Sequence, residues 1–211
     1  ESGPAAGVLA AANAGSLCGI ENIISFDMGG TTAKAAMIEA GEIPYTTEYE
    51  VGASLSSGNR LTGGGGELIL APAIAIGEVG AGGGSIAAID GAGALKVGPR
   101  SAGALPGPVC YQRGGTQPTV TDANVALGYI RAGRLAGGDV VIDEAAATQA
   151  IEEQIAEPLG LETIPAALGV HDIANAMMLR ALREVSVHRG RDPREFTMVA
   201  FGGSGPVHAA N

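Results

Sequence analysis

The feature that most constrains this chain is a glycine-rich turn that directly follows an apolar, β-branched run. Residues 20–26 read Ile-Glu-Asn-Ile-Ile-Ser-Phe, and residues 27–32 read Asp-Met-Gly-Gly-Thr-Thr. The first run predicts a buried central strand that Asp27 ends, and residues 33–39 resume as a second strand. The segment 23–39 is therefore predicted to be a hairpin that carries the glycine turn at its tip.

The residue types of this turn suit a nucleotide phosphate. Gly29 and Gly30 let the backbone approach a phosphate without a Cβ in the way, and Thr31 and Thr32 add hydroxyl donors. Asp27, at the strand end, is able to hold a hydrated Mg²⁺ ion. The structural alternative is a plain hairpin turn with a capping aspartate. We interpret the segment as a phosphate site, with Asp27 as candidate metal ligand and catalytic residue.

A second glycine turn occurs near the end of the sequence. Residues 200–206 read Ala-Phe-Gly-Gly-Ser-Gly-Pro, where a predicted strand over 196–201 enters a turn that opens a helix. This geometry suits an anion, or a base and ribose lying over the backbone. A tight strand-to-helix turn without a ligand is the alternative. The candidate nucleotide-binding residues here are Gly202, Gly203, Ser204 and Gly205.

A third glycine segment, residues 78–85, reads Glu-Val-Gly-Ala-Gly-Gly-Gly-Ser. It is open to two interpretations, a substrate or phosphate loop and a glycine-rich corner between two strands. We keep Gly82, Gly83, Gly84 and Ser85 as substrate-loop candidates. Glu78 is kept as a second candidate catalytic carboxylate.

Residues 98–119 contain several prolines and no periodicity, which predicts a long ordered or substrate-facing loop. Cys110, Tyr111 and Arg113 in this loop, with Asp122 just beyond it, are further substrate-loop candidates. Cys110 has no histidine nearby in sequence, so a buried, inert thiol competes with a nucleophile as its interpretation. Asp122 has a competing assignment as a helix cap.

The remaining elements are predicted from periodicity and from helix start and stop signals. The predicted strands cover 44–51, 68–79, 85–89 and 94–97, and the Gly63–Gly66 run is interpreted as a mobile loop. The predicted helices cover 5–16, 122–130, 143–159 and 163–189, with Gly160 and Gly190 ending the last two. His171 and His188 are expected on helix surfaces, and His208 is a candidate to face a bound nucleotide.

Composition excludes some functions and partners. The net charge is −10, with 22 acidic and 12 basic residues, and no basic patch is visible, so nucleic acid is not expected as a partner. No apolar run reaches the ~18 residues of a membrane span. The two cysteines form no metal-ligand pattern, which favours reduced thiols and a cytoplasmic location.

Seven segments carry a resemblance to a known family. In chain order they are SGPAAGV, FDMGGTTAKA, EVGAGGGSIAAID, VGPRSAGALPGPVCY, RGGTQPTVTDAN, RGRDPREF and AFGGSGPVHA. Together they resemble the hydantoinase A/oxoprolinase family of ATP-dependent, ring-opening amidohydrolases. The resemblance implies an α/β fold of the actin/hexokinase/Hsp70-like ATPase type. It would be partial: one lobe, with an inserted β-rich region and helices.

The same resemblance implies an activity and its requirements. Residues 27–32 match the family's second phosphate motif and residues 202–205 its adenosine motif. Members use ATP and a divalent metal, Mg²⁺ or Mn²⁺, to activate a cyclic amide or imide such as a hydantoin or 5-oxoproline for hydrolysis. Relatives are ATP-using subunits of acetone and acetophenone carboxylases. A non-catalytic nucleotide-binding module is the third possibility, and a second subunit or domain of hydantoinase B type is the expected partner.

The chain also departs from the family pattern. The family's first phosphate motif lies in an N-terminal region that this sequence lacks. Residues 1–211 are therefore expected to be one domain, a fragment of a longer chain that is inactive alone. Some members carry Asp where Lys34 stands. Two interpretations of Lys34 stay open: it contacts a phosphate, or it points to solvent.

Overall fold

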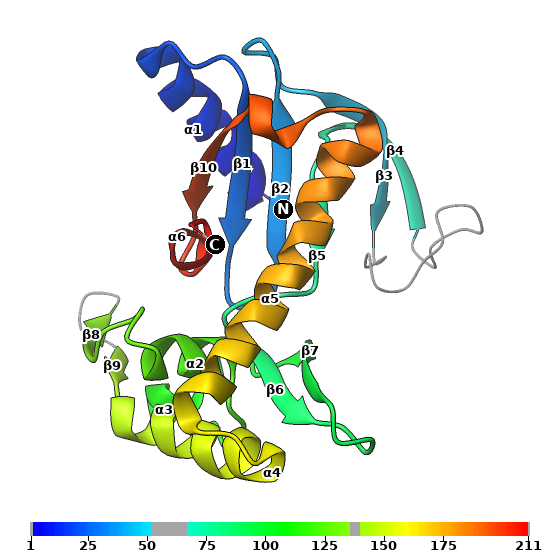
Figure 1. Cartoon of the computed structure of the whole chain (residues 1–211). Helices are drawn as coiled ribbons and strands as arrows, with labels where there is room; N and C mark the ends of the chain where they lie inside the picture. Colours follow the sequence, from blue (N-terminus) through cyan, green and yellow to red (C-terminus); the bar gives the residue numbers. More distant parts are fainter. Residues whose placement is uncertain (1, 52–66, 136–139, 211) are drawn as a thin grey trace. The chain divides into compact units, whose positions relative to one another are not determined.

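The computed structural model describes residues 2–51, 67–135 and 140–210. The chain divides into two compact units. Unit 1 consists of Glu1–Met28, Thr32–Gly80 and Met178–Ala209, and unit 2 of Gly29–Thr31, Ala81–Met177 and Ala210–Asn211. Both units combine helices and strands (Figure 1), so the α/β class predicted from the sequence is confirmed.

Unit 1 is built on a four-stranded sheet in the order β10-β1-β2-β5 (Figure 1). The strands are β1 (Ile23–Met28), β2 (Ala33–Ile38), β5 (Gly77–Val79) and β10 (Thr197–Phe201). β1 runs antiparallel to β2, which confirms the predicted hairpin, and parallel to β10 from the other end of the sequence. Asp27 does not end β1 as predicted, because it pairs with Lys34 on one side and Phe201 on the other.

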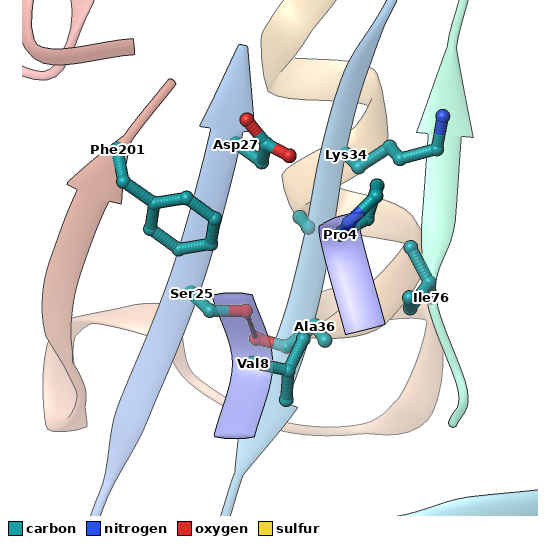
Figure 2. Close-up of a pocket in the computed structure, with 9 residues that line it drawn as sticks. Pro4, Val8, Ser25, Asp27, Lys34, Ala36, Ile76 and Phe201 are labelled. Carbon is teal, nitrogen blue, oxygen red and sulfur yellow. Dashed lines mark hydrogen bonds between the residues drawn. The ribbon is translucent and has the colours of Figure 1, made fainter. Parts of the chain in front are cut away.

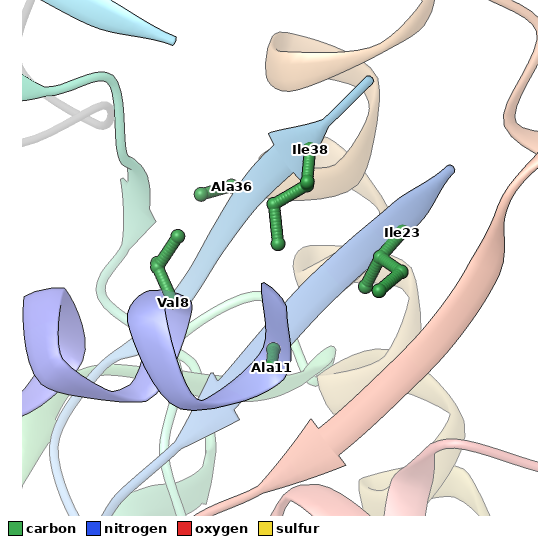
Figure 3. Close-up of a cluster of buried hydrophobic side chains, with 5 residues drawn as sticks. All are labelled: Val8, Ala11, Ile23, Ala36 and Ile38. Carbon is green, nitrogen blue, oxygen red and sulfur yellow. The ribbon is translucent and has the colours of Figure 1, made fainter. Parts of the chain in front are cut away.

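One face of this sheet is covered by α1 (Ser2–Cys18), which confirms the predicted helix and extends it at both ends. Val8 and Ala11 of α1 contact Ile23 of β1 and Ala36 and Ile38 of β2 (Figure 3). All five are at most 2% exposed. Burying one isoleucine side chain contributes roughly 1.5–3 kcal/mol, so this small cluster fixes α1 against β1 and β2, the two strands of the predicted hairpin.

The rest of the β-rich region in unit 1 differs from the prediction. The run 68–79 is not one strand, because its two parts have different partners. β4 (Glu67–Ile74) pairs with β3 (Tyr45–Val51), whereas β5 pairs with β2. The Gly63–Gly66 run lies outside the described residues.

Unit 2 contains the antiparallel pair β6 (Ser85–Ile89) and β7 (Leu95–Ser101). β7 is longer than the strand predicted over 94–97. A 3₁₀ turn η1 (Val109–Tyr111) interrupts the predicted loop, and α2 (Val120–Ala126) starts and ends earlier than predicted. A further antiparallel pair joins β8 (Gly133–Leu135) to β9 (Val140–Ile142).

The next helical segment of unit 2 follows the sequence signals closely. It comprises α3 (Glu144–Ile151), a π-helical turn η3 (Glu152–Ala156) and α4 (Glu157–Leu159). Asp143 caps its start by accepting a hydrogen bond from the Ala146 N–H at 3.0 Å, and Gly160 ends it with φ of +65°. Both capping predictions are confirmed.

Helix α5 (Thr163–Val185) carries two corrections. It ends at Val185 and does not continue to Gly190. Gly190 instead ends a separate 3₁₀ turn, η4 (Val187–Arg189). His171 was expected on the surface but is only 1% exposed. Its Nδ1 lies 2.7 Å from Oδ1 of Asn124, and its ring meets the edge of Tyr129 at 5.1 Å between centroids.

From Met178, within α5, the chain belongs to unit 1 again, and it continues through η5 (Pro193–Glu195), β10 and α6 (Gly205–His208). The predicted local charge pair in this connection is confirmed, with Arg194 Nη2 2.6 Å from Asp192 Oδ2. In the ranges that the structure describes, no helix combines the length and the apolar character that crossing a membrane requires.

The buried histidine predicts a pH dependence of stability. Burial lowers the pKa of His171 from its ordinary value of 6.5. Below pH 6.5 the unfolded chain therefore binds a proton that the folded chain resists, so stability falls as the pH drops. Urea unfolding between pH 7 and pH 5 should show wild type losing up to about 1.4 kcal/mol per pH unit relative to His171→Gln. An unchanged slope in His171→Gln would contradict this account.

Candidate functional site

The glycine turn that follows β10 approaches the end of β1 within unit 1. Gly202 has φ of +82°, and a Cβ atom there would collide with the Asp27 carboxylate and lie 2.6 Å from the Met28 carbonyl oxygen. The Ser204 N–H donates to that same carbonyl at 3.0 Å. The turn after β10 therefore folds over the end of β1, and only glycine fits at position 202.

Asp27 lies in a row of side chains that crosses the sheet. The strand register aligns Phe201 of β10, Asp27 of β1, Lys34 of β2 and Glu78 of β5. Figure 2 shows Phe201, Asp27 and Lys34 along this row, beside Pro4 of α1. In open sheets, ligands bind at the carboxyl ends of parallel strands. β10 ends at this row and β1 ends one residue beyond it, at Met28.

The electrostatics of the row centre on the lysine. Lys34 Nζ lies 3.0 Å from Glu78 Oε1 and donates a second hydrogen bond to Thr32 Oγ1 at 3.1 Å. The side chains of Lys34 and Glu78 are 14% and 39% exposed. Burial raises the pKa of the Asp27 carboxyl, and the positive charge of Lys34 opposes that rise. The lysine therefore neither points to solvent nor stands free for a phosphate.

Sequence reasoning missed this Lys34, Glu78 and Thr32 group. Strand alternation gave no signal for the contact of Thr32 with Lys34, because Thr32 precedes both the predicted strand and β2, which begins at Ala33. The pairing with Glu78 depends on β5 lying beside β2, and no local pattern predicts that neighbour.

A narrow depression on this face is lined by side chains of α1 and the sheet (Figure 2). They are Pro4, Val8, Ser25, Asp27, Lys34, Ala35, Ala36, Ile76 and Phe201. The depression has no room for a water molecule, so it is not itself a nucleotide pocket. It shows instead that the stems of Asp27 and Lys34 are packed among apolar atoms while their charged ends lie near the strand termini.

The tip of the hairpin, Gly29–Thr31, belongs to unit 2 and lies on the third glycine segment. The N–H groups of Gly83 and Gly84 donate to the carbonyls of Gly29 and Gly30 at 3.0 and 2.6 Å. A Cβ at Gly82 would lie 2.6 Å from the Gly30 carbonyl carbon, so the two backbones are in direct contact.

Because the N–H groups of Gly83 and Gly84 bond to the hairpin tip, they are not available to a ligand. The Gly82 N–H is also engaged, since it donates to Ser85 Oγ at 2.9 Å. The hydrogen bonding therefore favours the structural interpretation of the 82–85 segment, as a support for the turn. Across the described part of the chain, no hydrogen bond engages the N–H groups of Gly30 and Thr31, and both residues are exposed.

The candidates of the 106–124 segment separate into internal and surface residues. Asp122 is fully buried, and its carboxylate accepts hydrogen bonds from the N–H groups of Thr119, Cys110 and Val109 at 2.8, 2.8 and 3.2 Å. It forms a capping box with Thr119 at the start of α2. Cys110 is also fully buried, and burial and the nearby Asp122 raise the pKa of its thiol.

These observations favour the inert interpretation of Cys110 and a structural role for Asp122. Tyr111 is half-buried and Arg113 is exposed, so of the four only these two have surface within reach of a substrate. Among the nucleotide-binding candidates, Gly202 and Gly203 are exposed, whereas Ser204 and Gly205 are buried. His208 is 4% exposed, which disfavours a direct nucleotide contact.

Comparison with known proteins identifies the family. The model of the Hydantoinase/oxoprolinase family matches residues 1–211. The chain belongs to the hydantoinase/oxoprolinase family. The resemblance carried by the seven sequence segments is confirmed.

Three members of the hydantoinase/oxoprolinase family illustrate its range. An uncharacterized protein of Methanocaldococcus jannaschii is 48% identical over 99% of this chain and 30% of its own length. Caprolactamase subunit alpha of Pseudomonas jessenii is 42% identical over 98% of this chain and 28% of its own length. The acetophenone carboxylase gamma subunit of Aromatoleum aromaticum is 41% identical over 99% and 27%.

Two solved structures of the family share this fold. The crystal structure of ATP-dependent caprolactamase from Pseudomonas jessenii has a TM-score of 0.85 and 41% identity, covering 100% of this chain and 28% of that one. The nucleotide-free structure of acetone carboxylase, from work on ATP-dependent acetone carboxylation, has a TM-score of 0.82 and 33% identity, covering 98% and 28%. The chain thus spans less than a third of the length of these relatives.

The close contact at Gly202 predicts different effects for two neighbouring glycines. Gly202→Ala adds a methyl group at positive φ against Asp27 and Met28, and should lower the free energy of unfolding by about 1–3 kcal/mol. Gly203→Ala adds a methyl group that meets nothing within 4 Å, and should change it by less than about 0.5 kcal/mol. Urea unfolding measures both. Equal effects of the two substitutions would show that the turn does not fold over β1 as described.

Proposed function

We propose that this chain supplies part of the ATP site of an enzyme that hydrolyses a cyclic amide or imide of hydantoin or 5-oxoproline type. The observation that carries the proposal is the contact of Gly202 and Ser204 with Asp27 and Met28, which sets the glycine turn after β10 against the end of β1, at the carboxyl ends of two parallel strands. This arrangement supports an ATPase fold of the actin/hexokinase/Hsp70 type. The similarity to the ATP-dependent caprolactamase supports ATP as the nucleotide.

The proposed chemistry starts from the poor reactivity of an amide carbonyl. Transfer of the γ-phosphoryl group of ATP to the amide oxygen turns that oxygen into a good leaving group, and water then adds at the carbonyl carbon. The ring C–N bond breaks with the nitrogen as the leaving group, and a second water hydrolyses the acyl phosphate that remains. The overall products are ADP, inorganic phosphate and the ring-opened acid. Catalysis of such a transfer depends mainly on positioning and on neutralising charge at the phosphates.

Each part of the candidate site has a role in this proposal. The exposed N–H groups of Gly30 and Thr31 contact phosphate oxygens, and Thr32 adds a hydroxyl donor. The turn 202–205 lies beside the adenosine. The negative charge of the protein is compatible with ATP because backbone N–H groups and a metal ion, not a field of lysines, offset the charge of the phosphates.

Asp27 fits a Mg²⁺ or Mn²⁺ ion that is shared with the nucleotide. In the described ranges no three His, Cys, Asp or Glu side chains form a group able to hold a metal. Mg²⁺ is commonly bound through one or two carboxylates together with substrate phosphates and water, and a single partly exposed aspartate beside a phosphate turn suits that mode. The metal, when bound, would neutralise charge on the phosphates.

The rest of the enzyme is expected outside these 211 residues. Relatives are named as subunits of a caprolactamase and of an acetophenone carboxylase, and the chain spans 28% and 27% of them. We propose that the family's first phosphate motif is supplied by another region, and that a second subunit or domain of hydantoinase B type completes the substrate site. The cytoplasmic location stays a prediction.

A specific observation favours one alternative function. The relatives that this chain resembles at 42% and 41% identity include both a caprolactamase subunit and a carboxylase subunit. An ATP-using subunit of a carboxylase of acetone or acetophenone type would use the same phosphate site, with phosphoryl transfer activating the ketone for carboxylation instead of an amide for hydrolysis.

The first experiment tests the phosphate site. In the complete protein, Asp27→Asn should abolish substrate-dependent ATP hydrolysis, a loss of at least about 100-fold, because the metal at the phosphates loses its protein carboxylate. Circular dichroism should show an intact fold, and Asp143→Ala, which removes a helix cap in unit 2, should retain turnover. Full activity of Asp27→Asn would refute the assignment.

The second experiment separates the functions. Release of inorganic phosphate by the complete protein is measured with caprolactam, hydantoins and 5-oxoproline, and then with acetone or acetophenone plus bicarbonate. We expect a cyclic amide to stimulate release. Stimulation only by a ketone with bicarbonate would establish the carboxylase alternative, and binding of MgATP without turnover on any substrate would favour a non-catalytic nucleotide-binding module.

A further inference from the structure

We propose that Lys34 is a positioning residue that acts on the nucleotide through Thr32. This inference rests on the proposed function, because it gives a role to a residue beside the phosphate turn. All of its members, Thr32, Lys34 and Glu78, lie in unit 1. None of the sequence patterns places them together.

The contacts of the ammonium group define the arrangement. Lys34 Nζ is 3.0 Å from Glu78 Oε1 and 3.1 Å from Thr32 Oγ1, so one ammonium links an adjacent strand to the residue that ends the glycine turn. The register places Glu78 directly opposite Lys34, which holds the lysine across β5 and not along the strand toward solvent. At 14% exposure, the Lys34 side chain has little freedom to leave this position.

The hydrogen-bond chemistry of Thr32 explains how such a link would act. A threonine hydroxyl has one donor hydrogen and two acceptor lone pairs. An ammonium group only donates, so Thr32 Oγ1 must be the acceptor from Lys34 and its own hydrogen remains for another partner. Hydrogen bonds in a chain strengthen one another, so the lysine both orients this hydrogen and makes it a better donor to a phosphate oxygen.

The surroundings of the row argue against a role in stability alone. On this face α1 contributes Pro4 and Val8, and β10 contributes Phe201, none of which is charged. Lys34 is therefore a mostly buried charge among apolar side chains, next to Asp27, and its partner Glu78 is more exposed, at 39%. A partly buried pair of this kind gains little stability over apolar residues of similar size, so a functional reason for retaining it is favoured.

Binding of Mg²⁺ with the ATP analogue AMP-PNP to the complete protein tests the proposal by a double-mutant cycle. Lys34→Met and Thr32→Val should each weaken binding by about 10- to 100-fold, as expected for loss of a hydrogen bond to a charged group. Because the lysine acts through the threonine, the double variant should bind within about 3-fold of the weaker single variant. Lys34→Arg should restore most of the affinity lost in Lys34→Met.

Two controls accompany the cycle. Glu78→Gln removes the anchor of the ammonium and should weaken binding less than Lys34→Met does, and it serves as a second probe if Lys34→Met fails to fold. Lys96→Met is the matched control, because Lys96 pairs with Asp90 near the tip of the β6–β7 hairpin, with Nζ 2.8 Å from Oδ2 and a lysine side chain that is 66% exposed. The affinity of the Lys96→Met variant for Mg²⁺ and AMP-PNP should stay within about 2-fold of wild type.

The outcomes separate this inference from the proposed function. If the wild-type protein does not bind Mg²⁺ and AMP-PNP, the proposed ATP site itself is wrong. If wild type binds and the losses in Lys34→Met and Thr32→Val multiply in the double variant, Lys34 acts on the nucleotide independently of Thr32, and the positioning role is overturned.

Discussion

The close approach of the Gly202 backbone to the Asp27 carboxylate is the constraint on which the candidate site depends. It exists because β10, from the end of the sequence, pairs in parallel with β1, from its beginning, and both strands stop within one residue of the same level. Parallel strands leave their carboxyl ends side by side, where backbone N–H groups and polar side chains meet a ligand. The positive φ of Gly202 then lets the second turn fold back over Met28 without a side chain in the way.

The glycines of this chain serve two different purposes. Gly30 is exposed and its N–H is without a partner in the described residues, as a phosphate turn requires. The N–H groups of Gly82, Gly83 and Gly84 instead donate hydrogen bonds within the protein. Their acceptors are Ser85 Oγ and the carbonyls of Gly29 and Gly30, in that order. A rigid support behind a phosphate turn reduces the conformational entropy that is lost when a ligand binds.

Local sequence patterns predicted the features that local physics determines. The hairpin after residue 23, the Asp143 cap and the Gly160 stop all follow from signals within a few residues. The burial of His171 was missed because its partner Asn124 is 47 positions away in sequence. The link between Lys34 and Glu78, 44 positions apart, was missed for the same reason, and α5 ends at Val185 without a glycine or proline to mark it.

The central claim is that the ends of β1 and β10 hold nucleotide phosphates, and a crystal structure of the complete protein with Mg²⁺ and AMP-PNP tests it most directly. The account predicts phosphate oxygens within hydrogen-bond distance of the Gly30 and Thr31 N–H groups, the metal at Asp27, and the adenosine beside residues 202–205. A nucleotide bound elsewhere, with both glycine turns free of contact, would contradict it.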